Sequence, residues 1–206
     1  MKKKYTFVTI FFTGALFVVL SILSISSCSK TDIRLQEDEQ ESKIDAYLET
    51  LIKTENEKRA KEEEEDKKEY YPDLLELKIV EGSRVVLLEA LKDGGGISLE
   101  RGDSVHFYFA AYTFVSAPGL LFSTNVETLA SENLKDVDLS VKKVLYDSDN
   151  FLAGLYNGFS DVRAGDHLII AFSSKYGFGN SAMATVPKMS ALCYEIWIEK
   201  IVKNIK

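Results

Sequence analysis

The sequence has little of the chemistry on which most enzyme families rely. Its 206 residues include only two histidines, His106 and His167, so a histidine-based metal site or nucleophilic triad has few side chains to draw on. It also lacks the phosphate-binding loop, the dinucleotide-binding turn, the His-Glu-x-x-His zinc motif and the Gly-x-Ser-x-Gly nucleophile turn. We therefore expect neither a metal nor a cofactor, and we interpret both histidines as strand residues.

Cysteine is equally scarce, because Cys28 and Cys193 are the only two in the chain. They form no Cys-x-x-Cys pair, and if Cys28 is modified, as argued below, no disulfide framework is left. Cys193 lies in an alternating apolar run, so we expect it to behave as a small apolar residue rather than as a nucleophile.

Positive charge is also in short supply. The chain carries 25 Lys and Arg against 32 Asp and Glu, which gives a net charge of −7. An acidic protein is a poor candidate for binding nucleic acid, and an anionic membrane surface repels it. We expect no nucleic-acid partner, and any attachment to a membrane must come from a lipid rather than from a basic patch.

The N-terminus has the pattern of a secretory leader. Lysines occupy positions 2–4, an apolar run follows from Tyr5 to about Ile25, and two serines precede Cys28. This end is similar to the lipobox of bacterial lipoproteins, which implies a signal peptide at 1–27 and a lipid on Cys28. The protein would then face the periplasm in the cell envelope, anchored to a bacterial membrane. An uncleaved anchor helix is the alternative, since about 20 apolar residues can cross a membrane.

Residues 28–72 are expected to form an acidic helical linker between that lipid and the following domain. Asp32 to Glu69 contain no Gly or Pro and consist largely of Glu, Asp and Lys. One apolar stripe recurs at helical spacing within this run, formed by Ile44, Tyr47, Leu48, Leu51 and Ile52. The stripe could pair with a second copy or dock on its own domain, so the pattern leaves the oligomeric state open.

The remaining residues, 73–206, have the length and composition of one compact domain rich in strands. We expect strands at Arg84–Glu89, Ser104–Phe114, Val137–Leu145, His167–Ser173 and Ala191–Val202, with a short helix at Asn150–Phe159. Several strands with a single short helix and no alternation of strand and helix indicate an α+β fold with antiparallel pairing.

Six short motifs in this domain occur in the order typical of one family. They are Val105-His106-Phe107, Gly119-Leu120-Leu121-Phe122-Ser123, Leu152-Ala153-Gly154-Leu155, Gly165-Asp166, Tyr176-Gly177-Phe178-Gly179 and Val186-Pro187. From about Gly102 to Lys203 the chain resembles the FKBP-type peptidyl-prolyl cis-trans isomerases. The resemblance implies a curved antiparallel β-sheet wrapped around one short helix, here preceded by the charged N-terminal helix.

The resemblance also implies an apolar pocket for a proline ring. Two positions would act on the substrate carbonyl: the backbone N–H of Leu152, and Phe178, where the family has a tyrosine hydroxyl. The residues that would bind substrate are Phe107, Phe122, Ser123, Leu155, Val186 and Tyr194. All but Ser123 are apolar or aromatic, as a proline ring requires. The alternative is that these side chains simply form the domain core.

Four positions depart from the family pattern. Phe107 and Ser123 replace a tyrosine and an aspartate that hydrogen-bond to each other, Leu155 replaces a tryptophan, and Phe178 replaces the tyrosine. The expected function is therefore a membrane-anchored isomerase or folding helper of reduced activity, acting on proline-containing peptides or unfolded envelope proteins. The alternative is a non-catalytic FKBP-like lipoprotein that binds a peptide or protein.

Overall fold

The computed structural model describes residues 4–66, 71–92, 95–130, 134 and 137–204, with side chains from residue 30 onwards except those of 63–66. The chain divides into two compact units, Met1–Glu39 and Gln40–Lys206, and one long helix, α1 (Lys4–Asp66), contributes to both. Among the side chains described from residue 30 onwards, no helical stretch is sufficiently long and hydrophobic to span a bilayer. The predicted signal peptide and Cys28 lie outside the residues whose side chains are described.

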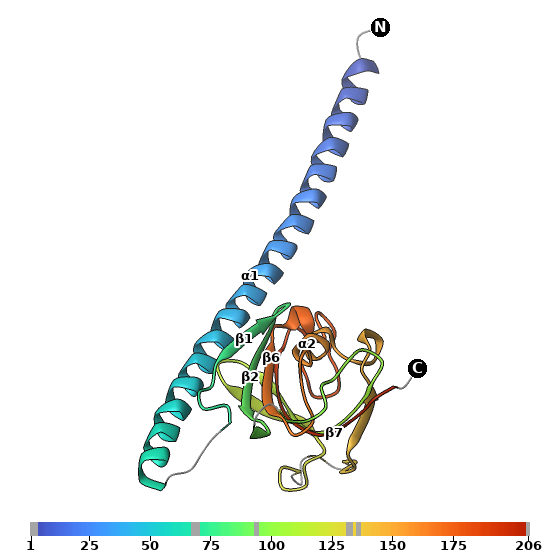
Figure 1. Ribbon diagram of the computed structural model, residues 1–206. Coiled ribbons are helices and arrows are strands. Elements are labelled where there is room, and N and C mark those ends of the chain that lie inside the picture. The colour runs from blue at the N-terminus through green and yellow to red at the C-terminus, as the bar shows by residue number, and fades with distance from the viewer. Residues whose placement is uncertain (1–3, 67–70, 93–94, 131–133, 135–136, 205–206) are drawn as a thin grey trace. The chain divides into compact units, whose positions relative to one another are not determined.

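The second unit is built on one antiparallel sheet (Figure 1). Its strands are β1 (Leu77–Val80), β2 (Ser83–Glu89), β3 (Ser104–Phe114), β4 (Pro118–Thr124), β5 (Lys142–Leu145), β6 (His167–Phe172) and β7 (Ala191–Val202). They run in the order β1-β2-β6-β7-β3-β4, and β5 pairs with β3. The α+β prediction is confirmed, because a short helix lies against a wholly antiparallel sheet.

The inner face of the sheet packs against α2 (Ala153–Gly158). The helix predicted at Asn150–Phe159 is shorter than expected and is preceded by a separate 3-10 turn, η2 (Ser148–Asn150). Leu152 separates the two pieces because its backbone is extended, with φ −59° and ψ 143°. The side chain of Asp147, two residues N-terminal to Asp149, accepts the Asp149 N–H at the start of η2 at 3.3 Å.

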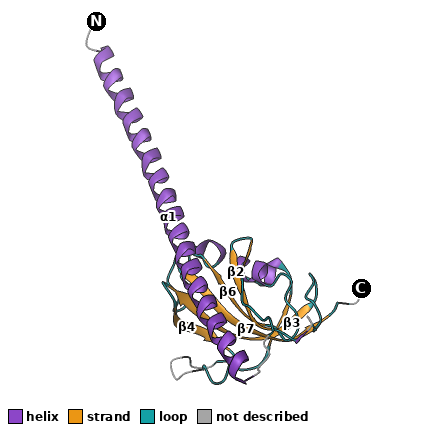
Figure 2. Ribbon diagram, turned by 60° about the vertical axis from the view of Figure 1, so that its left-hand side comes forward, coloured by secondary structure: helices purple, strands orange, loops and turns teal. Residues whose placement is uncertain are grey.

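The outer face of the sheet packs against the C-terminal part of α1, so the two helices lie on opposite faces (Figure 2). Ile44 and Leu48 are completely buried there. They share an apolar cluster with Leu75, Val86, Phe114, Ile169, Ala171, Ala191 and Cys193. Of the two alternatives for the stripe, the structure shows docking on the chain's own domain. The compact unit that contains the sheet begins at Gln40.

Cys193 belongs to this outer cluster and is only 2% exposed. Burial, and to a lesser degree the Glu195 carboxylate, raises the pKa of its thiol to about 12. A thiol that stays protonated at neutral pH is a poor nucleophile. The prediction that Cys193 acts as a small apolar residue is confirmed.

Two strands were not predicted, β5 is much shorter than predicted, and β6 ends one residue earlier than predicted, at Phe172. β1 is only four residues long, and β4 begins at Pro118 and leaves much of its surface exposed, so neither shows the alternation of a half-buried strand. β5 covers only the end of the predicted Val137–Leu145, and the two residues before Val137 lie outside the described part of the chain.

A buried carboxylate fixes the end of the last strand against the turn before β3. Asp103 is 3% exposed, and its two oxygens accept from Lys203 Nζ at 2.8 Å, the Glu100 N–H at 2.8 Å and the Asn204 N–H at 3.0 Å. Burial alone would raise the pKa of Asp103, but the Lys203 ammonium and the two backbone N–H groups outweigh it and hold that pKa below its usual value.

The Asp103→Asn variant is expected to lose stability in a pH-dependent way. A carboxyl whose pKa is lowered on folding stabilises the native state above its unfolded pKa of about 3.9, and this contribution is lost as the pH falls through the folded value. Urea unfolding should therefore show wild type more stable than the variant at pH 5–7, and a smaller difference below about pH 4. A difference that is the same at pH 3 and pH 7 would contradict a role for the charge.

Candidate functional site

A cavity of about 270 Å³ opens between the start of α2 and the inner face of the sheet. Seven of the predicted site residues line it: Phe107, Phe122, Ser123, Leu152, Leu155, Phe178 and Tyr194. They come from β3, β4, β7, the first turns of α2 and the loop after β6. The structure thus brings together side chains that are far apart in the sequence, around a mainly apolar space of a size suited to a small ring.

Val186 is the predicted site residue that does not line this cavity. It is 2% exposed and belongs to the core cluster of the inner face. Its backbone forms an isolated bridge with Met183, in which the Met183 N–H donates to the Val186 carbonyl at 3.0 Å. Val186 therefore supports the loop after β6 from within the core.

Five lining residues were not named in the sequence prediction. They are Phe109, Lys142, Val144, Asn150 and Phe151. Two of them could have been predicted from the sequence. Phe109 shares a strand face with Phe107, and Phe151 directly precedes the Leu152 motif. Lys142 and Val144 reach the cavity through the pairing of β5 with β3, in which Phe107 lies opposite Lys142. No local sequence pattern predicts the pairing of β5 with β3.

The walls of the cavity are held by contacts between aromatic rings. Phe107 lies 5.4 Å from Phe159 and 6.4 Å from Phe151, and Phe122 meets Tyr194 edge-on at 6.2 Å. Aromatic pairs in such stacked, tilted and edge-to-face geometries each add roughly 0.5–1.5 kcal/mol beyond the area that they bury. The pocket is therefore formed by mutually supported rings.

Leu152 carries a backbone N–H group at the N-terminus of α2 and lines the cavity. Leu152 directly precedes the helix, and its carbonyl accepts the Tyr156 N–H at 2.9 Å. Its N–H comes before the first helical residue, so the helix provides no acceptor for it. Leu152 thus places an amide donor at the rim of an apolar cavity.

The loop after β6, which carries Phe178, is closed by backbone hydrogen bonds. It begins with the 3-10 turn η3 (Ser174–Tyr176), and the Ser174 carbonyl accepts from the N–H groups of Gly177 and Gly179, both at 3.0 Å. The Met189 N–H in turn donates to the Gly179 carbonyl at 2.7 Å. Both ends of the segment 174–189 therefore meet near Gly179.

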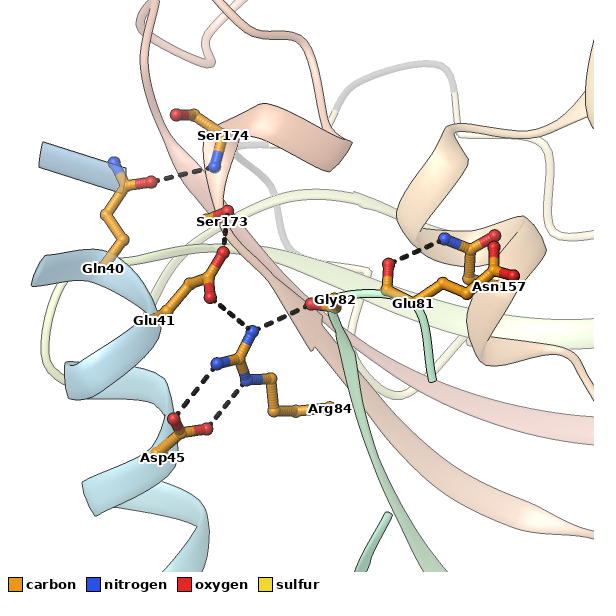
Figure 3. A network of polar contacts seen from close by, with 9 residues as sticks. All are labelled: Gln40, Glu41, Asp45, Glu81, Gly82, Arg84, Asn157, Ser173 and Ser174. Carbon is orange, nitrogen blue, oxygen red and sulfur yellow. Dashed lines mark hydrogen bonds and ion pairs between the residues drawn. The ribbon is translucent and has the colours of Figure 1, made fainter. Parts of the chain in front are cut away.

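A side chain of α1 joins the same two ends. Gln40 Oε1 accepts the Ser174 N–H at 2.8 Å, and Gln40 Nε2 donates to the Met189 carbonyl at 2.7 Å (Figure 3 shows the first of these bonds). The neighbouring Glu41 accepts from Ser173 Oγ at 3.1 Å. The docked part of α1 therefore contacts the loop that bears Phe178.

Arg84 forms the centre of the polar contacts between α1 and the sheet (Figure 3). Its guanidinium binds Asp45 at 2.8 and 3.1 Å, Glu41 at 3.1 Å and the Gly82 carbonyl at 3.0 Å, and its side chain is 7% exposed. Burial opposes the charge, but the two carboxylates outweigh it and raise the pKa of Arg84. The paired charges fix the register of the helix on the sheet.

Another cavity, of about 500 Å³, lies on the outer face between α1 and the sheet. Several of its charged groups are engaged within the protein: His167 contacts Glu195 at 2.9 Å, and Arg59 donates to the carbonyls of Pro72 and Leu88 at 2.7 and 2.6 Å. It holds none of the predicted site residues. The inner cavity is therefore the better candidate for a functional site.

Comparison with known proteins identifies the fold. No protein-family model and no curated protein matches the chain. The N-terminal domain of FKBP42 from Arabidopsis thaliana superposes with a TM-score of 0.50 at 16% identity, covering 62% of this chain and 93% of that domain. The three FKBP domains of wheat FKBP73 match with a TM-score of 0.48 at 15% identity, covering 63% of this chain and 50% of that structure.

The fold is therefore FKBP-like, with a curved antiparallel sheet around a short helix and a charged helix before it. The predicted fold is confirmed. At 16% identity the likeness shows the fold alone, so any activity has to be argued from the side chains of the inner cavity.

Proposed function

We propose that the chain is an FKBP-type peptidyl-prolyl cis-trans isomerase of reduced activity that binds proline-containing segments of unfolded proteins. The observation that carries this proposal is the inner cavity, where Phe107, Leu155, Phe178 and Tyr194 surround an apolar space beside the N–H of Leu152. An apolar cavity of about 270 Å³ suits a proline ring, and the N–H suits a neighbouring carbonyl.

Such a site can act without an acid, a base or a metal. The barrier to rotation about a peptide bond is about 18–20 kcal/mol because the twisted amide loses its resonance. A site that binds the twisted form more tightly than the planar forms lowers that barrier. In this chain the apolar walls would exclude water, and the Leu152 N–H would hold a carbonyl of the bound segment.

The lining residues also explain why we propose reduced activity. Phe178 has no hydroxyl to donate to a carbonyl, and neither Phe107 nor Ser123 supplies the tyrosine and aspartate groups of the family pattern. Each missing hydrogen bond would cost about 0.5–1.5 kcal/mol of stabilisation. These same substitutions favour the second candidate function, a non-catalytic module that holds a proline-containing peptide or protein.

We propose further that the protein acts in the cell envelope of a bacterium, facing the periplasm and anchored through a lipid on Cys28. The support is the order of charged, apolar and small residues from Lys2 to Cys28. With the three leader lysines removed, the net charge changes from −7 to −10, so a lipid rather than charge would hold the protein at the membrane. Unfolded envelope proteins are then the proposed partners.

Replacing Phe178 by tyrosine is expected to raise the isomerase activity about 3- to 10-fold, because one new hydrogen bond of ordinary strength would be made in the transition state. The measurement is the rate of a proline-limited refolding reaction at several concentrations of the full chain. Wild type is expected to accelerate it weakly.

The matched control is Phe178→Leu, which keeps an apolar side chain without a hydroxyl and should give no increase. If neither wild type nor Phe178→Tyr accelerates refolding at high concentration, catalysis is ruled out. If both still bind a proline-containing tetrapeptide, the non-catalytic function takes its place.

A further inference from the structure

The Tyr194 hydroxyl has no hydrogen-bond partner among the described residues, and it belongs to a mainly apolar site. Tyr194 lies on β7, lines the inner cavity and is 7% exposed. Its ring is stacked on Phe172 with centroids 5.9 Å apart and meets the edge of Phe122 at 6.2 Å. Among the described residues, no hydrogen-bond partner contacts the phenol oxygen. The FKBP resemblance alone gives no reason to expect a hydroxyl without a partner at this position.

The oxygen nevertheless remains accessible. It is not among the fully enclosed side-chain atoms that lack a partner within the described chain. A polar atom that has no partner and is not fully enclosed must meet the open space beside it. For Tyr194 that space is the cavity, because the rest of the ring is packed between Phe109, Phe122 and Phe172.

The phenol is held in the state that donates a hydrogen bond. Burial alone raises the pKa of Tyr194 above its ordinary value, so the group stays protonated across the physiological range. A protonated phenol can donate to a carbonyl oxygen. Because the oxygen is accessible, a bound ligand that supplies an acceptor can take the place of solvent at this hydroxyl.

We propose that the Tyr194 hydroxyl donates a hydrogen bond to a carbonyl of the peptide segment bound in the inner cavity. It thereby supplies from the strand the kind of donor that Phe178 does not supply from the loop. This inference rests on the proposed function, because it assumes that the ligand is a peptide whose proline enters the cavity. It identifies Tyr194 as a residue that selects for a carbonyl beside the proline ring.

The test compares Tyr194→Phe with a matched variant, Tyr146→Phe, in the full chain. Tyr146 is 8% exposed, lies outside the cavity lining, and its hydroxyl does have a partner, the Tyr156 carbonyl at 3.0 Å. Both variants remove one hydroxyl from a largely buried tyrosine. They differ in whether that hydroxyl is already bonded in the free protein.

The two variants should give opposite results. Tyr194→Phe is expected to leave the urea midpoint unchanged or raised and to weaken binding of a tetrapeptide with one central Leu-Pro bond about 3- to 10-fold. Tyr146→Phe should lower the urea midpoint and leave the peptide affinity unchanged. The readouts are urea unfolding without peptide and calorimetric titration with it.

Two outcomes would overturn the inference. A lower urea midpoint for Tyr194→Phe would show that its hydroxyl already has a partner in the free protein, whether or not any peptide binds. An unchanged peptide affinity in that variant would show that the hydroxyl does not touch the ligand. Failure of wild type to bind the tetrapeptide would instead contradict the proposed function, and the urea midpoint would still decide whether the hydroxyl is free.

Discussion

Replacing Leu48 by alanine is expected to lower the free energy of unfolding by about 2–5 kcal/mol, as for other leucines removed from a packed core. Leu48 belongs to the apolar stripe of the otherwise charged helix α1, and it is completely buried against the outer face of the sheet. Its removal would leave a cavity beside Val86 and Ile169. Urea unfolding of the full chain measures the effect.

Glu49→Ala is the matched control, since Glu49 is the next residue of the helix and is exposed. It should change stability by no more than about 0.5 kcal/mol. A loss below about 1 kcal/mol for Leu48→Ala would show that α1 does not dock in solution. A fragment that begins at Leu74 would lack Ile44 and Leu48. It would therefore expose the outer apolar cluster.

Replacing Gly154 by alanine is expected to lower the free energy of unfolding by about 3 kcal/mol, the upper part of the usual range for overpacking. A Cβ atom at this position would lie 2.2 Å from the Phe172 ring. The Gly154 carbonyl also accepts from Ser83 Oγ at 2.7 Å, which holds the helix α2 close to the sheet. Moving α2 away would displace Leu155 and weaken peptide binding as well.

The control for this substitution is Gly119→Ala. A Cβ at Gly119 would meet the Thr113 carbonyl oxygen at 3.4 Å, an ordinary contact on an exposed strand. Its stability should change by less than about 0.5 kcal/mol. Equal effects of the two substitutions would contradict the view that close approach of α2 to Phe172 shapes the cavity.

The strands that were predicted with correct boundaries are those whose sequence shows both a long apolar run and a turn at its ends. β3 and β7 are long β-branched and aromatic runs bounded by turns, and both were placed at Ser104–Phe114 and Ala191–Val202. β4 was missed because an edge strand that begins with proline and is half exposed has no regular alternation. The local sequence pattern thus predicts the central strands of the sheet but not its edge strand β4.

Most members of the inner cavity were identified from motif order, which places residues on known elements without giving their depth. Val186 follows the motif but is buried in the core, whereas Phe109 shares the face of Phe107 and does line the cavity. The docking of α1 could not be decided either, because a stripe such as Ile44 and Leu48 shows which face is apolar but not which surface covers it.

The amide of Gln40 has a consequence for the order in which the protein folds. Its two partners, Ser174 and Met189, lie 134 and 149 residues further along the chain. A chain made from its N-terminus exposes this part of α1 long before β6 and β7 exist. The apolar stripe that follows Gln40 therefore cannot complete its packing before β6 and β7 have been made, and such distant contacts form slowly. The helix α1 is thus made before the strands on which it docks, and the loop that bears Phe178 is completed only after Met189 has been made.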